Sequence, residues 1–265
     1  MKRIAWLTDI HLNFLPPAGL KAFFDSLPVA DAFAITGDIG EAPDVAGHLR
    51  AFAGHGRPVY FVLGNHDFYR ASIASVRAEI VQLCREVPTL LWMPDAGIQP
   101  LTETTCLVGH DGWGDGRFGD YLNSDVMLND FGLIAEFGGF DEGSHERLAK
   151  LHALGDEAAS HFRAVLPDAL SRFRHIIVLT HVPPFRESCW HEGKVSDDNW
   201  LPFFACRAVG DVLRAAMALA PDRQMTVLCG HTHSSGDVQI TPNLRVLTGS
   251  AVYCEPGVQR IIEVD

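Results

Sequence analysis

Short apolar runs along the chain repeatedly end in a glycine or in a cluster of polar residues. Five such runs occur, at residues 3–8, 32–36, 59–63, 176–180 and 225–229. Apolar, partly β-branched runs of this length that end at a turn residue are typical of buried strands. Helix-like stretches at about 19–27, 43–52 and 71–86 separate the first strands from one another. The pattern therefore predicts an α/β protein.

Strands that alternate with helices favour a largely parallel sheet, whose ligands collect beyond the carboxyl ends of the strands. The last part of the chain differs, because short strand candidates at 238–241, 244–248 and 260–264 are joined by close turns. We expect these strands to form an antiparallel second sheet. No repeat or flexible linker interrupts the chain, so residues 1–265 are expected to form one domain with an irregular substrate-loop insertion at about 109–146.

The composition narrows the functional class. The 265 residues include 33 acidic and 21 basic side chains, which gives a formal net charge of −12. This balance disfavours a long nucleic acid or an anionic membrane surface as partner, because both attract clustered lysine and arginine. The sequence has no signal-peptide or membrane-spanning pattern, and no CxxC pair occurs among its six cysteines. We therefore expect reduced thiols and a cytoplasmic protein.

The polar clusters that follow the five strands contain the side chains that bind metals. Carboxylate, amide and imidazole groups together suit manganese, iron, zinc or cobalt better than magnesium or calcium alone. Seven candidates exceed the four ligands of a structural zinc site and suit two ions, with the two oxygens of one carboxylate bridging them. Residues two apart on an extended segment point the same way, so neighbouring pairs should aim together. The candidates are Asp9, His11, Asp38, Asn65, His181, His231 and His233.

Such a pair of ions indicates phosphoester hydrolysis. Two ions about 3.5–4 Å apart can activate a bridging hydroxide as nucleophile and hold the oxygens of a tetrahedral phosphorus centre. His66 is the remaining imidazole beside the cluster, and as the imidazolium it could protonate the leaving alkoxide. Asp67 either orients His66 or serves only as a turn residue.

The five clusters together resemble the signature of the calcineurin-like metallophosphoesterases. The signature appears in order as Asp9-Ile10-His11, Gly37-Asp38, Gly64-Asn65-His66-Asp67, His181, and Gly230-His231-Thr232-His233. The resemblance implies a four-layer α/β/β/α sandwich, in which two mixed sheets are flanked by helices. It also implies that one metal takes Asp9, His11, Asp38 and His233, that the other takes Asp38, Asn65, His181 and His231, and that His66 contacts the substrate phosphate.

The substrate class remains open at this point. We expect a small phosphodiester or phosphomonoester, with the diester preferred because the GNHD form and the compact size resemble bacterial phosphodiesterases of the family. The alternatives are a phosphatase acting on phosphoprotein and a non-catalytic metal-binding scaffold of the same fold. Metal stoichiometry together with turnover separates the scaffold from the enzyme. The sequence carries no signal for an oligomeric state.

Several residues on loops near the motifs are candidates for substrate contact. Arginine can hold a phosphate with two hydrogen bonds, and aromatic rings can stack on a leaving group. Each of these residues could instead simply pack the rim of the site. We expect the segments at 109–146 and 185–200 to decide the substrate. The candidates are His110, Trp113, Arg117, Tyr69, Arg70 and His191.

Overall fold

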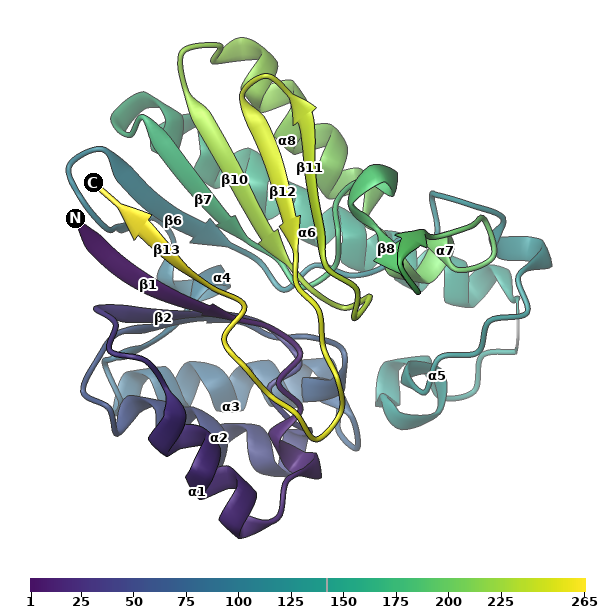
Figure 1. Cartoon of the computed structure of the whole chain (residues 1–265). Helices are drawn as coiled ribbons and strands as arrows, with labels where there is room; N and C mark the ends of the chain where they lie inside the picture. The colour runs from purple at the N-terminus through teal and green to yellow at the C-terminus, as the bar shows by residue number, and fades with distance from the viewer. Residues whose placement is uncertain (142) are drawn as a thin grey trace.

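The computed structural model describes residues 1–141 and 143–265, and its core is a pair of β-sheets. The first sheet has the strand order β13-β1-β2-β3-β4. Strands β1 to β4 run parallel, and β13 pairs antiparallel with β1 at the edge, so that the two chain ends lie side by side (Figure 1). The bounds are β1 (Lys2–Leu7), β2 (Ala32–Thr36), β3 (Val59–Val62), β4 (Leu90–Trp92) and β13 (Arg260–Val264).

The second sheet has the order β11-β12-β10-β7-β6-β5. Its four central strands are parallel, and only the edge strands β11 and β5 run antiparallel to their neighbours. The bounds are β5 (Gln99–Pro100), β6 (Thr105–Gly109), β7 (His175–Leu179), β10 (Gln224–Cys229), β11 (Gly236–Thr241) and β12 (Leu244–Thr248). A separate hairpin joins β8 (Trp190–His191) to β9 (Lys194–Val195).

The expectation of an antiparallel second sheet was wrong. The β11–β12 hairpin forms as the close turn indicated, but β12 lies parallel to β10, and the last strand, β13, joins the first sheet. The sequence of a short apolar strand indicates that both of its faces are buried. It does not indicate which strand lies beside it, because strand pairing depends on packing across the whole sheet.

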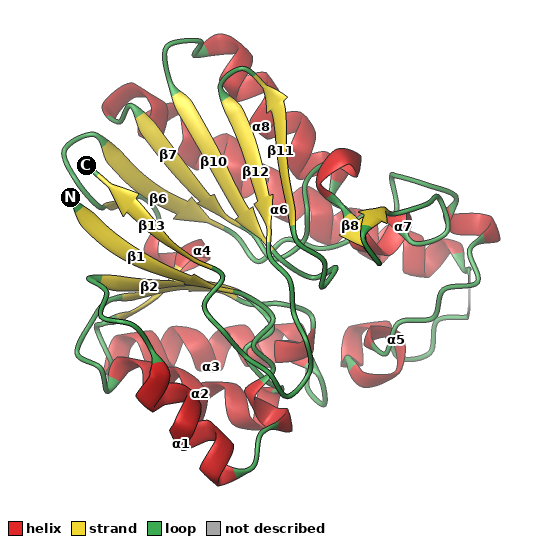
Figure 2. Ribbon diagram, in the orientation of Figure 1, coloured by secondary structure: helices red, strands yellow, loops and turns green. Residues whose placement is uncertain are grey.

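Helices cover the outer face of each sheet, which gives the expected α/β/β/α sandwich (Figure 2). Helices α1 (Pro17–Ser26), α2 (Ala42–Ala53) and α3 (Ile73–Glu86) pack on the first sheet, and α6 (His145–Arg172) and α8 (Arg207–Leu219) pack on the second. Between the layers, Trp6 and Val62 of the first sheet meet Leu179 and Leu228 of the second in one buried cluster. The fold class is therefore confirmed.

Local sequence explains where these helices begin and which face they bury. In α3 the Ser72 side chain accepts a hydrogen bond from the Ser75 backbone N–H and caps the first turn. Its buried residues Val76, Ile80 and Leu83 recur at helical spacing and face the sheet. The short elements are α4 (Met93–Ala96), α5 (Asp130–Leu133), α7 (Leu201–Phe204), and the 3₁₀ turns η1 (Leu12–Phe14), η2 (His66–Phe68), η3 (Tyr121–Asn123), η4 (Ala135–Phe137) and η5 (Arg186–Ser188).

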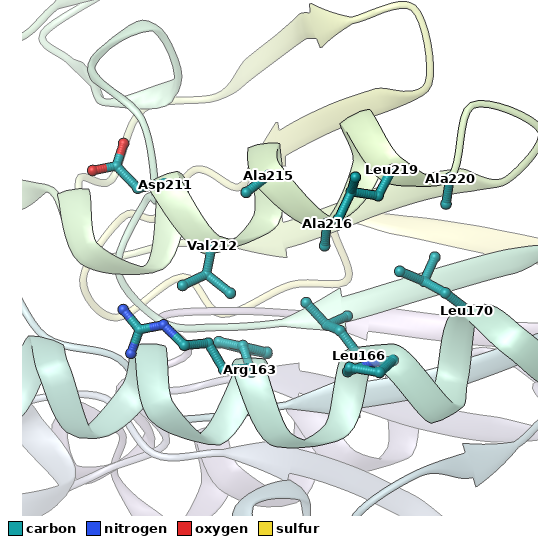
Figure 3. Close-up of a pocket in the computed structure, with 11 residues that line it drawn as sticks. Arg163, Leu166, Leu170, Asp211, Val212, Ala215, Ala216, Leu219 and Ala220 are labelled. Atoms are coloured by element: carbon teal, nitrogen blue, oxygen red, sulfur yellow. The ribbon is translucent and has the colours of Figure 1, made fainter.

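The outer surface has a groove that lies away from the predicted ligands. A groove of about 610 Å³ lies between α6 and α8, on the outer helical layer, and aliphatic residues such as Leu166, Val212 and Leu219 line most of it (Figure 3). The groove contains none of the predicted ligands. Among the described residues, no helix combines the length and the apolar character that a membrane crossing requires.

Candidate metal centre

The predicted ligands converge from the carboxyl ends of both sheets. Asp9, Asp38 and Asn65 follow β1, β2 and β3 of the first sheet, whereas His181 and His231 follow β7 and β10 of the second. The two sheets lie face to face, so their strand ends meet at a common edge. The site is thus built across the seam between two sheets instead of along the edge of one.

Most ligands lie in an unusual backbone conformation. The left-handed region holds five of the seven: Asp9 (φ 48°), His11 (φ 41°), Asp38 (φ 52°), His231 (φ 71°) and His233 (φ 58°). Non-glycine residues rarely adopt this region, and clusters of them mark functional sites that the surrounding structure holds in place. The extended geometry assumed for the two ligand pairs is therefore absent.

Two motif glycines let the loops approach the carboxylates. A Cβ atom on Gly64 would lie 2.1 Å from Asp38 Oδ1, and one on Gly230 would lie 1.9 Å from Asp9 Oδ2. No side chain tolerates such distances. Close approach, in addition to the tight turns predicted from the sequence, therefore requires glycine at these two positions.

One group of donors gathers around Asp9, His11, Asp38 and His233, whose ligand atoms all lie within 4.8 Å of one another. His11 Nε2 lies 3.2 Å from His233 Nε2 and 3.7 Å from Asp38 Oδ2. His233 Nε2 lies 3.5 Å from Asp9 Oδ1. Tetrahedral ligands about 2.0–2.1 Å from an ion lie about 3.3–3.4 Å apart, so these spacings suit one metal ion.

The second group contains Asn65, His181, His231 and the other oxygen of Asp38. Asn65 Oδ1 lies 3.1 Å from His181 Nε2 and 3.0 Å from His231 Nδ1. Asp38 Oδ1 lies 3.4 Å from His181 Nε2. Asp38 therefore turns one oxygen toward each group, which is the arrangement of a bridging carboxylate. His231 and His233 fall in different groups.

Hydrogen bonds outside the second group fix its ring tautomers. His181 Nδ1 lies 2.8 Å from the Thr36 carbonyl oxygen, and His231 Nε2 lies 3.1 Å from that of Phe203. Each of these nitrogens must carry the proton, because a carbonyl oxygen only accepts. The inward nitrogens of the two neutral rings, His181 Nε2 and His231 Nδ1, are then unprotonated and lie only 3.2 Å apart. Two lone pairs at this distance repel unless a cation lies between them, so the donors fit a metal ion.

Burial disfavours the charged form of the ligand side chains. Burial lowers the pKa of His11 to about 2 and that of His231 to about 3. These rings are therefore neutral at pH 7, the form that binds metals. Burial, together with the nearby carboxylates Asp9 and Asp67, raises the pKa of Asp38 well above its usual value. The anion that a bridging ligand needs is therefore favoured only when positive charge is bound beside it.

The orientation of Asn65 depends on a residue that the sequence analysis missed. The Asn65 amide donates from Nδ2 to Asp130 Oδ1 at 2.8 Å, which leaves Asn65 Oδ1 facing the two histidines. The Tyr69 hydroxyl donates to the same Asp130 oxygen at 2.7 Å. Asp130 is buried and begins α5, inside the irregular 109–146 segment. Nothing in its sequence neighbourhood indicated this contact.

His66 lies at the cavity over the metal groups. Its ring stacks on Tyr69 at 4.3 Å between centroids and meets the His11 ring edge-on at 4.6 Å. The His66 backbone N–H donates to Asp38 Oδ1 at 3.0 Å. Burial lowers the pKa of the His66 ring to about 3. The backbone hydrogen bond therefore fixes His66 relative to Asp38, and the His66 ring lies beside the first metal group.

Asp67 makes contacts that differ from the catalytic role predicted for it. Its carboxylate accepts hydrogen bonds from the backbone N–H groups of Ile39 and Gly40, both at 2.9 Å, and of Gly64 at 2.8 Å. None of the hydrogen bonds found for it in the described chain reaches His66. Asp67 ties the loop that carries Asp38 to the loop that carries Asn65, so its geometry favours the structural alternative.

Two of the six substrate candidates reach the cavity. Tyr69 and His191 line a cavity of about 250 Å³ directly over the ligands. Sequence reasoning missed Met127, Phe204 and Tyr253, which line the same cavity. Met127 lies in the 109–146 segment that was expected to decide the substrate, whereas Phe204 and Tyr253 lie outside both expected segments.

The other four candidates do not line this cavity. His110 is buried against His161 of α6, and Trp113 packs between Phe68 and Phe137. Arg117 pairs with Asp115 and Asp156, and Arg70 pairs with Glu41. Each has a structural partner, and none of the four lines the cavity over the ligands. Trp113 instead borders a small pocket of about 10 Å³ that Asn65, His181 and His231 also line.

Comparisons with known proteins agree with this geometry. The sequence profile of a family described as calcineurin-like phosphoesterase matches residues 2–235. None of the curated proteins matches the chain. Similar solved structures include a protein from Thermus thermophilus, at 14% identity and a TM-score of 0.56, covering 98% of this chain and 99% of the other. A dimetal phosphatase from Danio rerio aligns at 13% identity and a TM-score of 0.55, covering 94% and 87%.

A third solved structure with this fold has a description of a different kind. A Plasmodium protein described as the anchor in the inner membrane complex aligns at 14% identity and a TM-score of 0.50, covering 93% of this chain and 70% of that one. At such identities a likeness shows the fold and nothing finer.

Proposed function

Because the chain belongs to the calcineurin-like phosphoesterase family, we propose that it is a hydrolase that uses two metal ions to cleave a small phosphodiester. The observation that carries the proposal is the pair of donor groups that share Asp38. The facing nitrogens of His181 and His231 have no hydrogen between them, and the two groups together offer seven donor residues for two ions. Manganese, iron, zinc and cobalt all accept this mixture of nitrogen and oxygen.

The ions would supply a lowered water pKa and positive charge at the phosphate oxygens. The residues of the chain supply the negative charge at the metals, the contact with the phosphate and the positions of the loops. Asp38 and Asp9 bring two negative charges to the site, and the imidazoles and Asn65 bring none when they act as ligands. His66 is proposed to contact the phosphate, because it lines the cavity beside the first group. Burial keeps its ring neutral, so the ring is proposed to donate a hydrogen bond from its N–H to the leaving oxygen and not to act as the imidazolium expected from the sequence. Asp67 keeps the loops of Asp38 and Asn65 in register.

Charge favours a diester over a monoester. Two divalent ions and the two carboxylates Asp9 and Asp38 leave a net charge of about +2, and a hydroxide nucleophile reduces this to about +1. A phosphodiester carries one negative charge and balances it, whereas a monoester dianion leaves an excess. No lysine or arginine belongs to the described lining of the cavity to offset that excess.

The size of the cavity favours a small substrate. At about 250 Å³ it lies below the range of about 300–1,000 Å³ typical of sites for drug-sized ligands. This favours a small ester over a phosphorylated loop of another protein. The complete donor set favours an enzyme over a scaffold, although an anchor protein shares the fold. We further propose that residues 1–265 act as one cytoplasmic domain.

The test uses metal-stripped protein reconstituted with Mn²⁺. Bis-(p-nitrophenyl) phosphate and p-nitrophenyl phosphate are compared at equal concentrations, and kcat/KM for the diester is expected to be higher. Asp38→Asn should lower kcat/KM at least about 100-fold, because the bridging charge is lost. Asp168→Asn is the matched control, since Asp168 pairs with Arg172 on the outer helix α6. Full turnover after exhaustive chelation, or in Asp38→Asn, would contradict the proposal.

A further inference from the structure

The cavity over the ligands has one wall that the metal chemistry does not explain. The motif residues form its floor, but Met127, Phe204 and Tyr253 come from other segments. Tyr253 lies on the loop between β12 and β13, beyond residues 2–235 that match the family profile. Met127 and Phe204 lie within the matched range but outside the five signature clusters, so only Tyr253 is a feature that the family profile does not cover.

Tyr253 packs over the first metal group. Its ring centroid lies 4.7 Å from that of His11 and 5.2 Å from that of His233. Phe14 braces it edge-on at 5.1 Å. The residue nevertheless remains 46% exposed. One part of the aromatic surface is thus fixed on the ligand histidines, and the rest is open at the cavity.

Other apolar side chains at this mouth are also left exposed. Met127, which lines the cavity, is 53% exposed, and Phe14 is 45% exposed. Exposed apolar surface that gathers at a polar cavity is typical of a ligand site. A cavity lined by the Tyr253 and Phe204 rings and by the Met127 thioether favours an aromatic guest, because sulfur and ring faces both attract ring edges.

The charges of the wall point the same way. The described lining contains no lysine or arginine, and its carboxylates are Asp38 and Asp130, both buried. A second phosphate or a carboxylate on the substrate would therefore find no lysine or arginine in this lining. An uncharged planar group finds rings and a thioether.

We propose that the substrate carries a planar aromatic group on its phosphoester, seated against Tyr253 and Met127 while the phosphate lies over the metal groups. The inference rests on the proposed function for the position of the phosphate. It adds the class of the esterified alcohol, which is an aryl or heteroaryl group without charge.

The test measures binding without turnover. Methylphosphonate, phenylphosphonate and cyclohexylphosphonate have P–C bonds that are not hydrolysed as esters, and they differ in the group that would meet the wall. Calorimetric titration of Mn²⁺-loaded protein should give a Kd for phenylphosphonate about tenfold lower than for methylphosphonate. Cyclohexylphosphonate has similar bulk without a ring face, and its Kd should lie between the two.

Three variants assign the effect to the wall. Tyr253→Leu should bring the ratio of the Kd of methylphosphonate to that of phenylphosphonate close to one, whatever its effect on either Kd alone. Tyr253→Phe keeps the ring and should keep the preference. Leu219→Ala changes an exposed apolar residue in the distant α6–α8 groove and should change nothing.

The outcomes separate this inference from the proposed function. Equal binding of methyl- and phenylphosphonate, a cyclohexyl group that binds as tightly as phenyl, or an unaltered preference in Tyr253→Leu would each overturn the aromatic subsite alone. If none of the three phosphonates binds, the phosphate site fails and the subsite fails with it.

Discussion

Asp130 gives the sharpest test of how the second metal group is held. It accepts two hydrogen bonds through one oxygen, from Asn65 Nδ2 at 2.8 Å and from the Tyr69 hydroxyl at 2.7 Å. In Asp130→Leu the Asn65 amide loses its shorter acceptor and keeps only the 3.3 Å hydrogen bond to the Tyr69 hydroxyl. Both donors lose their carboxylate partner in a buried place. The amide can then turn Nδ2 toward His181 and His231, where a donor repels a cation.

The size of the effect follows from these contacts. A hydrogen bond to a charged group contributes about 1.5–3 kcal/mol, and removing the partner of a metal ligand weakens metal binding about 10–100-fold. We therefore expect Asp130→Leu to weaken the second ion about 10–100-fold and to leave the first ion unchanged, because the hydrogen bonds of Asp130 reach none of the first group. Asp130→Asn keeps an acceptor oxygen and should lose less than about fivefold. Tyr69→Phe should lie near the wild type, since the 2.8 Å bond from Asn65 to Asp130 remains although both bonds of the Tyr69 hydroxyl are lost.

The assay is titration of metal-free protein with Mn²⁺ by calorimetry, with bound metal counted by elemental analysis at low free metal. The wild type should hold about two ions per chain and Asp130→Leu about one under the same conditions. Near-ultraviolet circular dichroism establishes that the variant is folded. Two ions bound with wild-type affinity in folded Asp130→Leu, or equal weakening of both ions, would refute the reasoning.

Three further predictions concern stability. Removing the metals should lower the free energy of unfolding by about 2.7 kcal/mol per ion held at 100 times its Kd, because each ion ties the two sheets together; a Tm that does not rise with added Mn²⁺ would contradict this. Asp67→Ala leaves three buried N–H groups unpaired and should lower the free energy of unfolding in urea by about 3 kcal/mol or more. If the role of Asp67 is structural, Asp67→Asn should leave the pH dependence of kcat unchanged. Burial lowers the pKa of His110 to about 3, so the unfolded chain binds the proton first. Stability should therefore be complete above about pH 6.5 and should fall toward pH 3 by up to about 1.4 kcal/mol per pH unit, a slope that His110→Gln should reduce.

The sequence predicted those features that depend on a local pattern of residue types. The apolar runs predicted β1, β2, β3, β7 and β10, because a buried strand needs apolar residues on both faces. The ligand types predicted two adjacent donor groups, and the fold brings all seven residues together across the sheet seam.

The remainder depends on contacts that no local pattern records. β12 gave a clear strand signal but no sign that it would run parallel to β10. Asp130 and Tyr253 lie in segments without periodicity, and they reach the site only after the sheets have packed. His110 follows a strand toward the site, yet its side chain turns into the helix layer, where it packs against His161 and Phe162.

The left-handed backbone at five ligand positions places this chain under a conflict between stability and activity. Each such residue costs the folded chain about 1–3 kcal/mol that a glycine would largely recover. Replacing Asp38 by glycine would therefore destroy the bridge and the hydrogen bond from the His66 backbone N–H while relaxing the backbone at this position. Random drift selected only for folding would erase the site in a few substitutions. At these five positions, metal binding requires an aspartate or a histidine, whereas backbone stability alone would favour glycine.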